Sequence, residues 1–120
     1  MGKRGVGPVS TKLPVDFYWG GELHEGVVKN ISRDGMCIDA DTCPPSGSDI
    51  EVVLVLGDES FNLPGKVHRT LSKNELSGIM SVELSNPSEG YLRFVSVVQD
   101  YAYSRPSLQR SRRIHEKVAS

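Results

Sequence analysis

Apolar and polar positions alternate in several short segments of this chain. In the segment Val15–Trp19 the apolar side chains of Val15, Phe17 and Trp19 occupy alternate positions, which is typical of a strand with one buried face. Turn residues separate five further segments of this kind, so the sequence predicts six short strands in a small antiparallel barrel or sandwich. The other predicted strands are Val27–Ile31, Met36–Ala40, Ile50–Leu56, Phe61–Arg69 and Ile79–Leu84.

Pro64 and Gly65 interrupt the fifth of these segments, Phe61–Arg69. Proline donates no backbone N–H to a strand ladder and is therefore found mainly at sheet edges and bulges. The sequence predicts that this strand carries a bulge or lies at a sheet edge near Pro64.

The apolar period becomes helical after the last predicted strand. We expect Asn86 to cap a helix, with Pro87 in its first turn and Glu89 three positions after the cap. Arg105-Pro106 is expected to end this helix, because proline disfavours helical backbone at the residue before it. The apolar face of the helix can close one end of the barrel. This face consists of Tyr91, Phe94, Val95, Val98 and Ala102.

Charge is distributed unevenly along the 120 residues, although the formal net charge is only −1. Residues 1–12 hold 3 basic and no acidic side chains, residues 13–104 hold 6 basic and 14 acidic ones, and residues 105–120 hold 5 basic and 1 acidic. We therefore divide the chain into a flexible basic lead (1–12), an acidic body (13–104) and a basic tail (105–120). Basic ends indicate either anionic ligands or partners, or simply solvated termini.

Several classes of protein are excluded by what the sequence lacks. No apolar run approaches the roughly 20 residues of a membrane helix, and no apolar stretch follows the basic start, so we expect a cytoplasmic protein without membrane insertion. Cys37 and Cys43 are expected to be free thiols, because their spacing is not that of a zinc or redox pair. His24, His68 and His115 lie in no nucleophile or metal motif, so neither catalysis nor a cofactor is predicted.

The segment Asn30-Ile31-Ser32-Arg33-Asp34-Gly35 carries the clearest binding chemistry. Asn30 and Ser32 project to the same side of a strand, because the side-chain period is two. The amide offers both a donor and an acceptor to a purine edge. Gly35 permits either a positive φ or the close approach of another group to the backbone. A polar turn without a ligand is the alternative, since these residue types are all common in turns.

This Asn-x-Ser-x-x-Gly motif ends the second predicted strand and resembles the signature of the PilZ family, Asp/Asn-x-Ser-x-x-Gly. The resemblance covers roughly residues 8–103 and includes Leu13-Pro14-Val15, Gly65–Arg69 and Gly78–Val82. It implies a mainly β fold, namely a six-stranded antiparallel barrel with a C-terminal α-helix. It also implies a non-enzymatic bacterial signalling module that binds the second messenger cyclic di-GMP as a regulatory ligand.

PilZ domains also carry Arg-x-x-x-Arg just before the first strand, and these arginines bind phosphates and guanine edges. Here Lys12 or Arg4 occupies one position of the pair, but Pro8 occupies the other in either register and offers neither charge nor donor. Arg110 of the tail is a candidate substitute. The resemblance therefore implies a cyclic di-GMP site made of Arg4, Lys12, Asn30, Ser32, Gly35 and, at a strand end, Arg69.

Three functions are left open by these patterns. The first is a cyclic di-GMP receptor that contacts a partner protein in motility, pilus or biofilm control. The second is an adaptor that has lost the nucleotide and acts only through protein contact, which the incomplete arginine pair favours. The third, nucleic-acid binding, is disfavoured because Phe17 and Trp19 alternate as core residues do, and Tyr18 alone makes no stacking platform.

Overall fold

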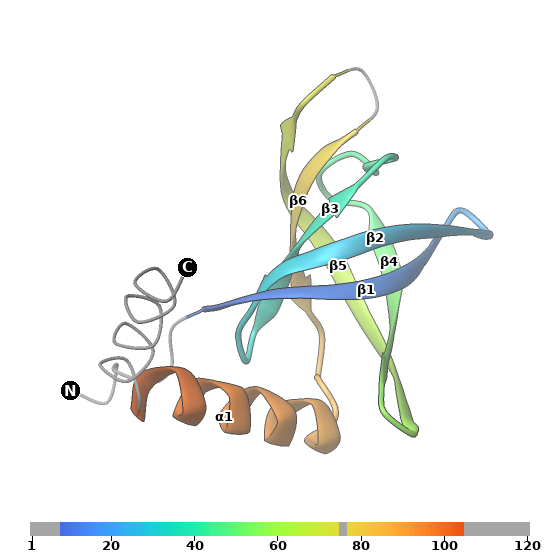
Figure 1. The fold of residues 1–120 in the computed structure, drawn as a ribbon. Coiled ribbons are helices and arrows are strands. Elements are labelled where there is room, and N and C mark those ends of the chain that lie inside the picture. The colour runs from blue at the N-terminus through green and yellow to red at the C-terminus, as the bar shows by residue number, and fades with distance from the viewer. Residues whose placement is uncertain (1–7, 75–76, 105–120) are drawn as a thin grey trace, which may run out of the picture.

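The six strands close into one antiparallel barrel, with a helix across one end (Figure 1). The computed structural model describes residues 8–74 and 77–104. Around the barrel the strands follow the order β1-β2-β3-β6-β5-β4, with β4 returning to β1. The predicted mainly β fold, a six-stranded antiparallel barrel with a C-terminal helix, is confirmed. The elements are β1 (Val9–Trp19), β2 (Glu22–Ile31), β3 (Gly35–Ala40), β4 (Asp49–Leu56), β5 (Glu59–Ser72), β6 (Gly78–Leu84) and α1 (Glu89–Ser104).

The first two strands are longer than their apolar alternation predicts. β1 begins at Val9 rather than Val15, and its pairing with β2 runs from Val9 opposite Ile31 to Trp19 opposite Glu22. Backbone hydrogen bonds continue this ladder through polar positions, where alternation of apolar side chains does not indicate a strand. The extension places the start of β1 beside the end of β2.

β5 continues through Pro64 without a register shift, so the prediction of a bulge or edge there is wrong. Pro64 lies opposite Glu51 of β4, and its carbonyl oxygen accepts a hydrogen bond from the Ser85 N–H at 2.8 Å. The hydrogen-bond ladder between β5 and β6 ends beside Pro64. The N–H that proline lacks therefore costs only the last hydrogen bond of that ladder. A closed barrel has no edge strand. The irregularity of β5 instead lies at His68.

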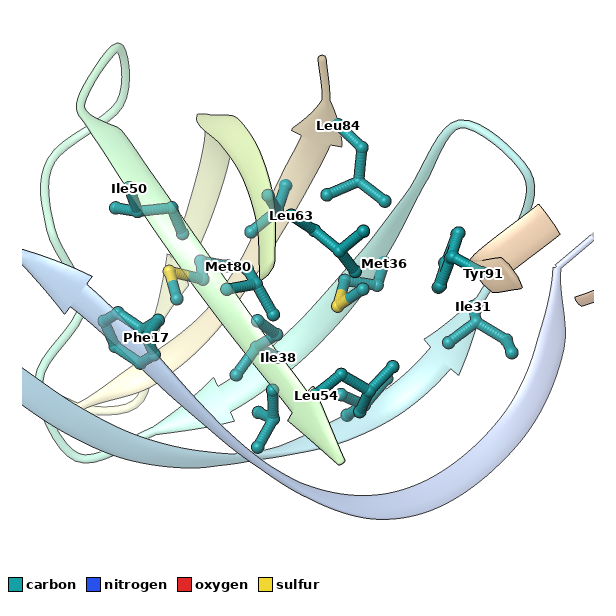
Figure 2. Packing of buried hydrophobic residues seen from close by; sticks show 14 of the residues in the cluster. Phe17, Ile31, Met36, Ile38, Ile50, Leu54, Leu63, Met80, Leu84 and Tyr91 are labelled. Carbon is teal, nitrogen blue, oxygen red and sulfur yellow. The ribbon is translucent and has the colours of Figure 1, made fainter. Parts of the chain in front are cut away.

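Inward-facing side chains from every strand fill the barrel interior (Figure 2). Phe17, Ile38 and Leu54 are completely buried, as the alternating pattern predicts. Tyr91 and Val95 of α1 are completely buried as well, so the helix closes the core as expected. Phe94 and Val98 of the predicted apolar face are half-buried, whereas the side chain of Ala102 and the pair Arg105-Pro106 lie outside the described residues.

Helix α1 begins at Glu89, later than the predicted cap at Asn86. Ser88 is the residue that caps it, because its Oγ accepts a hydrogen bond from the Tyr91 N–H at 3.3 Å. Asn86 instead has a φ of 53°, a left-handed conformation that asparagine tolerates better than most residues. Both residues are good caps, and the tight connection from β6 decides which one performs this role.

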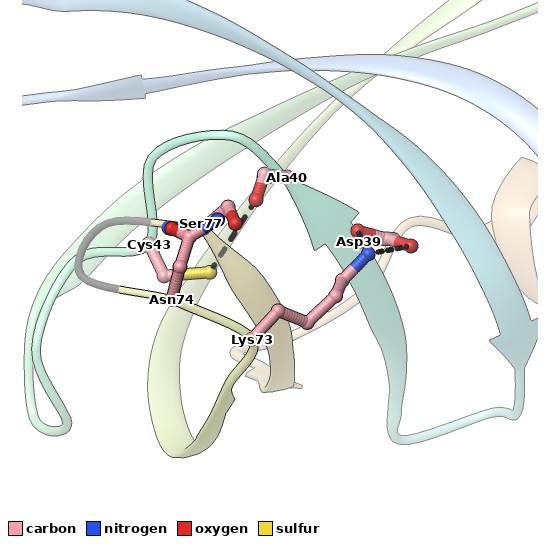
Figure 3. Close-up of polar contacts among 6 residues, drawn as sticks. All are labelled: Asp39, Ala40, Cys43, Lys73, Asn74 and Ser77. Atoms are coloured by element: carbon pink, nitrogen blue, oxygen red, sulfur yellow. Dashed lines mark hydrogen bonds and ion pairs between the residues drawn. The ribbon is translucent and has the colours of Figure 1, made fainter.

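Polar contacts join the ends of β3 and β5 and the loops that follow them (Figure 3). Lys73 Nζ lies 2.8 Å from Asp39 Oδ1 and 2.9 Å from Oδ2. Cys43 Sγ donates to the Ala40 carbonyl oxygen at 3.9 Å, and burial, assisted by the negative charge of Asp39, raises the pKa of the Cys43 thiol. Cys37 and Cys43 are both free, as predicted.

Candidate ligand-binding site

An open cavity of about 310 Å³ lies beside the connection from β2 to β3. Its volume is at the lower end of the range typical of small-molecule pockets, roughly 300–1,000 Å³. Asn30, Ser32 and Gly35 all line it, so the fold brings the three motif positions around one space. The other lining residues are Pro8, Asp34, Met36, Cys37, His68, Ser81, Val82 and Glu83.

Backbone and side-chain hydrogen bonds hold the turn Ser32–Gly35 in one conformation. The N–H of Ser32 donates to the Gly35 carbonyl oxygen at 2.9 Å, and Ser32 Oγ donates to the same oxygen at 3.3 Å. The N–H of Leu84 donates to the Asp34 carbonyl oxygen at 2.8 Å and so fastens the turn to the end of β6. The motif is therefore positioned without a ligand, which lowers the entropy cost of binding one.

A tyrosine from the helix supports this turn from inside the molecule. Tyr91 Oη donates to the Ser32 carbonyl oxygen at 2.9 Å and lies 3.3 Å from that of Gly35. Burial, with a smaller effect from the negative charge of Asp34, raises the pKa of the Tyr91 hydroxyl. The phenol therefore stays a protonated donor at ordinary pH.

Gly35 is required for space rather than for its φ. The glycines with positive φ in the described residues are Gly20, Gly21, Gly47 and Gly57, so the expectation of a positive φ at Gly35 is wrong. The alternative, a close approach to the backbone, is correct. A Cβ at Gly35 would overlap the carbonyl oxygen of Val82 on the neighbouring strand β6.

Register shifts interrupt three strands of the barrel, and one of them lies at the cavity. The register slips at Thr11–Lys12 in β1, at Lys29 in β2 and at His68 in β5. The slip in β5 accompanies the placement of His68 at the cavity. The sequence does not predict this placement, because nothing around His68 marks a bulge. His115 lies outside the described residues.

Among the basic residues expected at the site, the two that the structure describes, Lys12 and Arg69, are not brought to the cavity. Lys12 and Arg69 are both exposed, and neither lines it. Arg4 and Arg110, like most of the basic lead and the whole basic tail, lie outside the described residues. Within residues 8–74 and 77–104, no lysine or arginine lines the cavity, whereas Pro8 borders it.

Two carboxylates set the electrostatic character of the cavity. The carboxylate side chains of Asp34 and Glu83 both line it. An ionised carboxylate only accepts hydrogen bonds, so it suits a ligand edge that presents N–H donors. The Watson–Crick edge of guanine presents such donors, and the Asn30 amide adds both a donor and an acceptor. This part of the site therefore fits a guanine edge better than a phosphate.

Neither a membrane helix nor a metal centre is found in the part of the chain that the structure describes. No helix there is long and apolar enough to span a membrane. No group of three or more His, Cys, Asp or Glu side chains there is arranged to hold a metal ion.

Comparison with solved structures identifies the fold. The cyclic di-GMP-bound PilZ domain of YcgR from Escherichia coli has a TM-score of 0.61 and 15% identity, over 91% of this chain and 97% of that one. The PilZ domain of CeSA from a cellulose-synthesising bacterium has a TM-score of 0.56 and 16% identity, over 76% and 91%. The Bacillus subtilis inhibitor of motility MotI/DgrA has a TM-score of 0.65 and 18% identity, over 86% of this chain but only 51% of its own.

The sequence profile of a protein family leads to the same family as the solved structures, although a comparison with curated protein sequences gave no match. The sequence profile of the PilZ domain matches residues 2–98, which is most of the chain and includes the motif from Asn30 to Gly35. The barrel order, the closing helix and this match agree, and the chain belongs to the PilZ domain family of cyclic di-GMP receptors and adaptors.

Proposed function

We propose that this protein is a non-enzymatic cytoplasmic receptor for cyclic di-GMP that acts by contacting a partner protein. The observation that carries the proposal is the convergence of Asn30, Ser32 and Gly35 on one cavity that Pro8 of the basic lead also borders. Family membership supports it, as does the structural likeness to a YcgR domain that was solved with cyclic di-GMP.

In this proposal the barrel and the lead bind different parts of the ligand. Asn30, Asp34 and Glu83 bind a guanine edge, and Ser32 contributes its hydroxyl oxygen. Arg4 and Lys12 of the lead supply the positive charge that the phosphates need. Arg69 is a further candidate, because it pairs with Ser81 of the cavity lining. The ligand then joins the lead to the barrel and changes the surface offered to a partner.

The second candidate function is an adaptor that acts through protein contact without the nucleotide. The observation that favours it is the absence of lysine and arginine from the cavity lining within the described residues. A charge-assisted hydrogen bond contributes about 1.5–3 kcal/mol, so loss of one motif arginine weakens binding by roughly tenfold to a few hundredfold. A receptor of micromolar affinity would then bind only marginally.

Isothermal titration with cyclic di-GMP separates the two functions. We expect saturable binding to the wild type, a loss of at least about tenfold in Asn30→Ala, and a similar loss in the double variant Arg4→Ala/Lys12→Ala. Asn62→Ala is the matched control, because Asn62 is an exposed asparagine of β5 that does not line the cavity. No heat from the wild type at high micromolar ligand would favour the adaptor. Binding that none of the variants changes would refute the assigned site.

We propose motility, pilus or biofilm control as the process in which this receptor acts. The likeness of fold to MotI/DgrA, an inhibitor of motility, supports the first of these. Swimming of a bacterium that expresses the wild type should fall as cyclic di-GMP rises. Expression of Asn30→Ala should leave swimming unchanged if the ligand controls the partner contact.

A further inference from the structure

The cavity and the closing helix share one buried polar contact. Tyr91 of α1 is completely buried, and its hydroxyl reaches the carbonyl oxygens of Ser32 and Gly35 at 2.9 and 3.3 Å. These two residues are the ends of the motif turn, and their other faces line the cavity. The Tyr91 hydroxyl therefore contacts the motif turn from the core side, and the ligand contacts the same turn from the cavity side.

We propose that Tyr91 is a positioning residue that couples occupancy of the cavity to the docking of α1 on the barrel. This inference rests on the proposed function for its ligand and adds the route by which binding reaches the partner-facing surface. The two ends of the contact are far apart in the chain, so a movement of the turn passes directly to the helix.

The turn has little freedom to move without disturbing this contact. Two donors of Ser32 bond to the Gly35 carbonyl oxygen, the N–H at 2.9 Å and Oγ at 3.3 Å, and Tyr91 Oη, which donates to the Ser32 carbonyl oxygen at 2.9 Å, lies 3.3 Å from the same Gly35 oxygen. A ligand that donates to the Ser32 hydroxyl oxygen polarises this O–H and strengthens its bond to the Gly35 carbonyl oxygen. The bound state then holds the turn, and with it the phenol and the start of α1, more firmly.

The exposed face of α1 can present a firmer start of the helix to a partner protein. Tyr91 and Val95 face the core, whereas Arg93 and Val97 face solvent, with Val97 60% exposed. Phe61 of β5 also lies against the first turn of α1, where a Cβ on Gly90 would collide with its ring. A firmer start of α1 therefore fixes the position of its exposed face relative to the barrel.

Hydrogen exchange with and without cyclic di-GMP tests the coupling. In the wild type we expect saturating ligand to slow amide exchange across α1 by about tenfold. In Tyr91→Phe we expect the ligand to slow amide exchange across α1 by less than about twofold. We also expect ligand affinity to drop by about threefold to tenfold, because one neutral hydrogen bond is lost. Tyr18→Phe is the matched control, because Tyr18 is an exposed tyrosine of β1 that does not line the cavity. Full ligand-dependent slowing in Tyr91→Phe would overturn the proposal.

A ligand-free measurement separates failure of this inference from failure of the proposed function. Without ligand, Tyr91→Phe should raise exchange at the Ser32 and Leu84 amides at least threefold over Tyr18→Phe, while the core amide of Val52 changes less. Unchanged exchange at Ser32 and Leu84 refutes the coupling even if cyclic di-GMP binds. Increased exchange supports the coupling even if the wild type binds no nucleotide.

A second variant keeps the test valid if Tyr91→Phe fails to fold. Ser88→Ala removes the cap of α1, whose Oγ accepts from the Tyr91 N–H at 3.3 Å, and leaves the phenol in place. The coupling predicts that this loosening of the helix start also raises exchange at Ser32. Increased exchange confined to α1 would contradict it.

Discussion

Gly35 belongs both to the ligand motif and to the closure of the barrel. Its missing side chain leaves the space that the Val82 carbonyl oxygen of β6 occupies. The close approach of β3 and β6 at this point depends on that space, and their pairing places the turn before Gly35 at the cavity. A residue that the sequence assigns to ligand binding is thus first a packing requirement.

We therefore expect Gly35→Ala to destabilise the fold by about 1–3 kcal/mol, because the methyl group meets backbone that cannot move aside. Urea unfolding measures this change. Gly90→Ala is the comparison, since its Cβ would meet only the ring of Phe61, which can rotate, and alanine favours the helix by about 1 kcal/mol over glycine. Equal losses in the two variants would show that the Val82 carbonyl oxygen is not the obstacle.

Pro8 borders the cavity, and by resemblance to the Arg-x-x-x-Arg motif of the PilZ family it stands at an arginine position. Restoring the charge with Pro8→Arg should strengthen cyclic di-GMP binding by about tenfold or more, because one charge-assisted hydrogen bond is gained. Titration calorimetry measures the gain. Pro45→Arg adds the same charge at an exposed loop position that does not line the cavity. If both variants gained equally, general electrostatic attraction would account for the effect.

At the scale of single elements, β4 shows most directly how alternation produces the barrel wall. Val52 is completely buried in this strand, whereas Val55 is 61% exposed. The two side chains are identical and differ only in the face on which they lie, because successive residues of a strand point to opposite sides.

Val52→Ala should lower the free energy of unfolding by about 1.5–3 kcal/mol, because two buried methyl groups are lost and a cavity remains. Val55→Ala should change it by less than about 0.5 kcal/mol. Chemical denaturation of the two variants makes the comparison within one strand. A similar loss in both would mean that Val55 is covered in the folded protein, for example by another chain.

The irregularities of the elements were less predictable than the elements themselves. The sequence indicates strands and a helix from the periods of Phe17, Ile38 and Tyr91. It does not indicate that β5 slips at His68 rather than at Pro64, or that Ser88 rather than Asn86 caps α1. Each of these depends on a partner strand or a tight connection, and neighbours along the chain do not encode it.

At the scale of the whole molecule, the buried phenol of Tyr91 makes the free energy of unfolding fall at alkaline pH. Its pKa is raised in the folded state, so its contribution is complete below the unfolded value of about 10. Above that pH the unfolded chain loses the proton while the folded protein keeps it. The free energy of unfolding then falls by about 1.4 kcal/mol per pH unit from this group.

Urea unfolding of the wild type and Tyr91→Phe at about pH 8 and pH 10.5 tests this dependence. The difference in stability between the two proteins should narrow as the pH rises, because phenylalanine has no proton to lose. Other tyrosines and lysines titrate in both proteins and cancel in the difference. Parallel profiles would contradict a raised pKa at Tyr91.

By itself the sequence determined the class of fold, the inward faces of the strands and the motif Asn30-x-Ser32-x-x-Gly35, because these are patterns of period and spacing within short segments. Only the tertiary structure decided that His68 and Glu83 join the motif around one cavity, since they come from two other strands, β5 and β6, that the bulge at His68 and strand pairing bring beside the motif. It alone also placed Tyr91 under the motif turn. Closure of the barrel makes these contacts, and a contact between segments far apart in the chain produces no periodic pattern in the sequence.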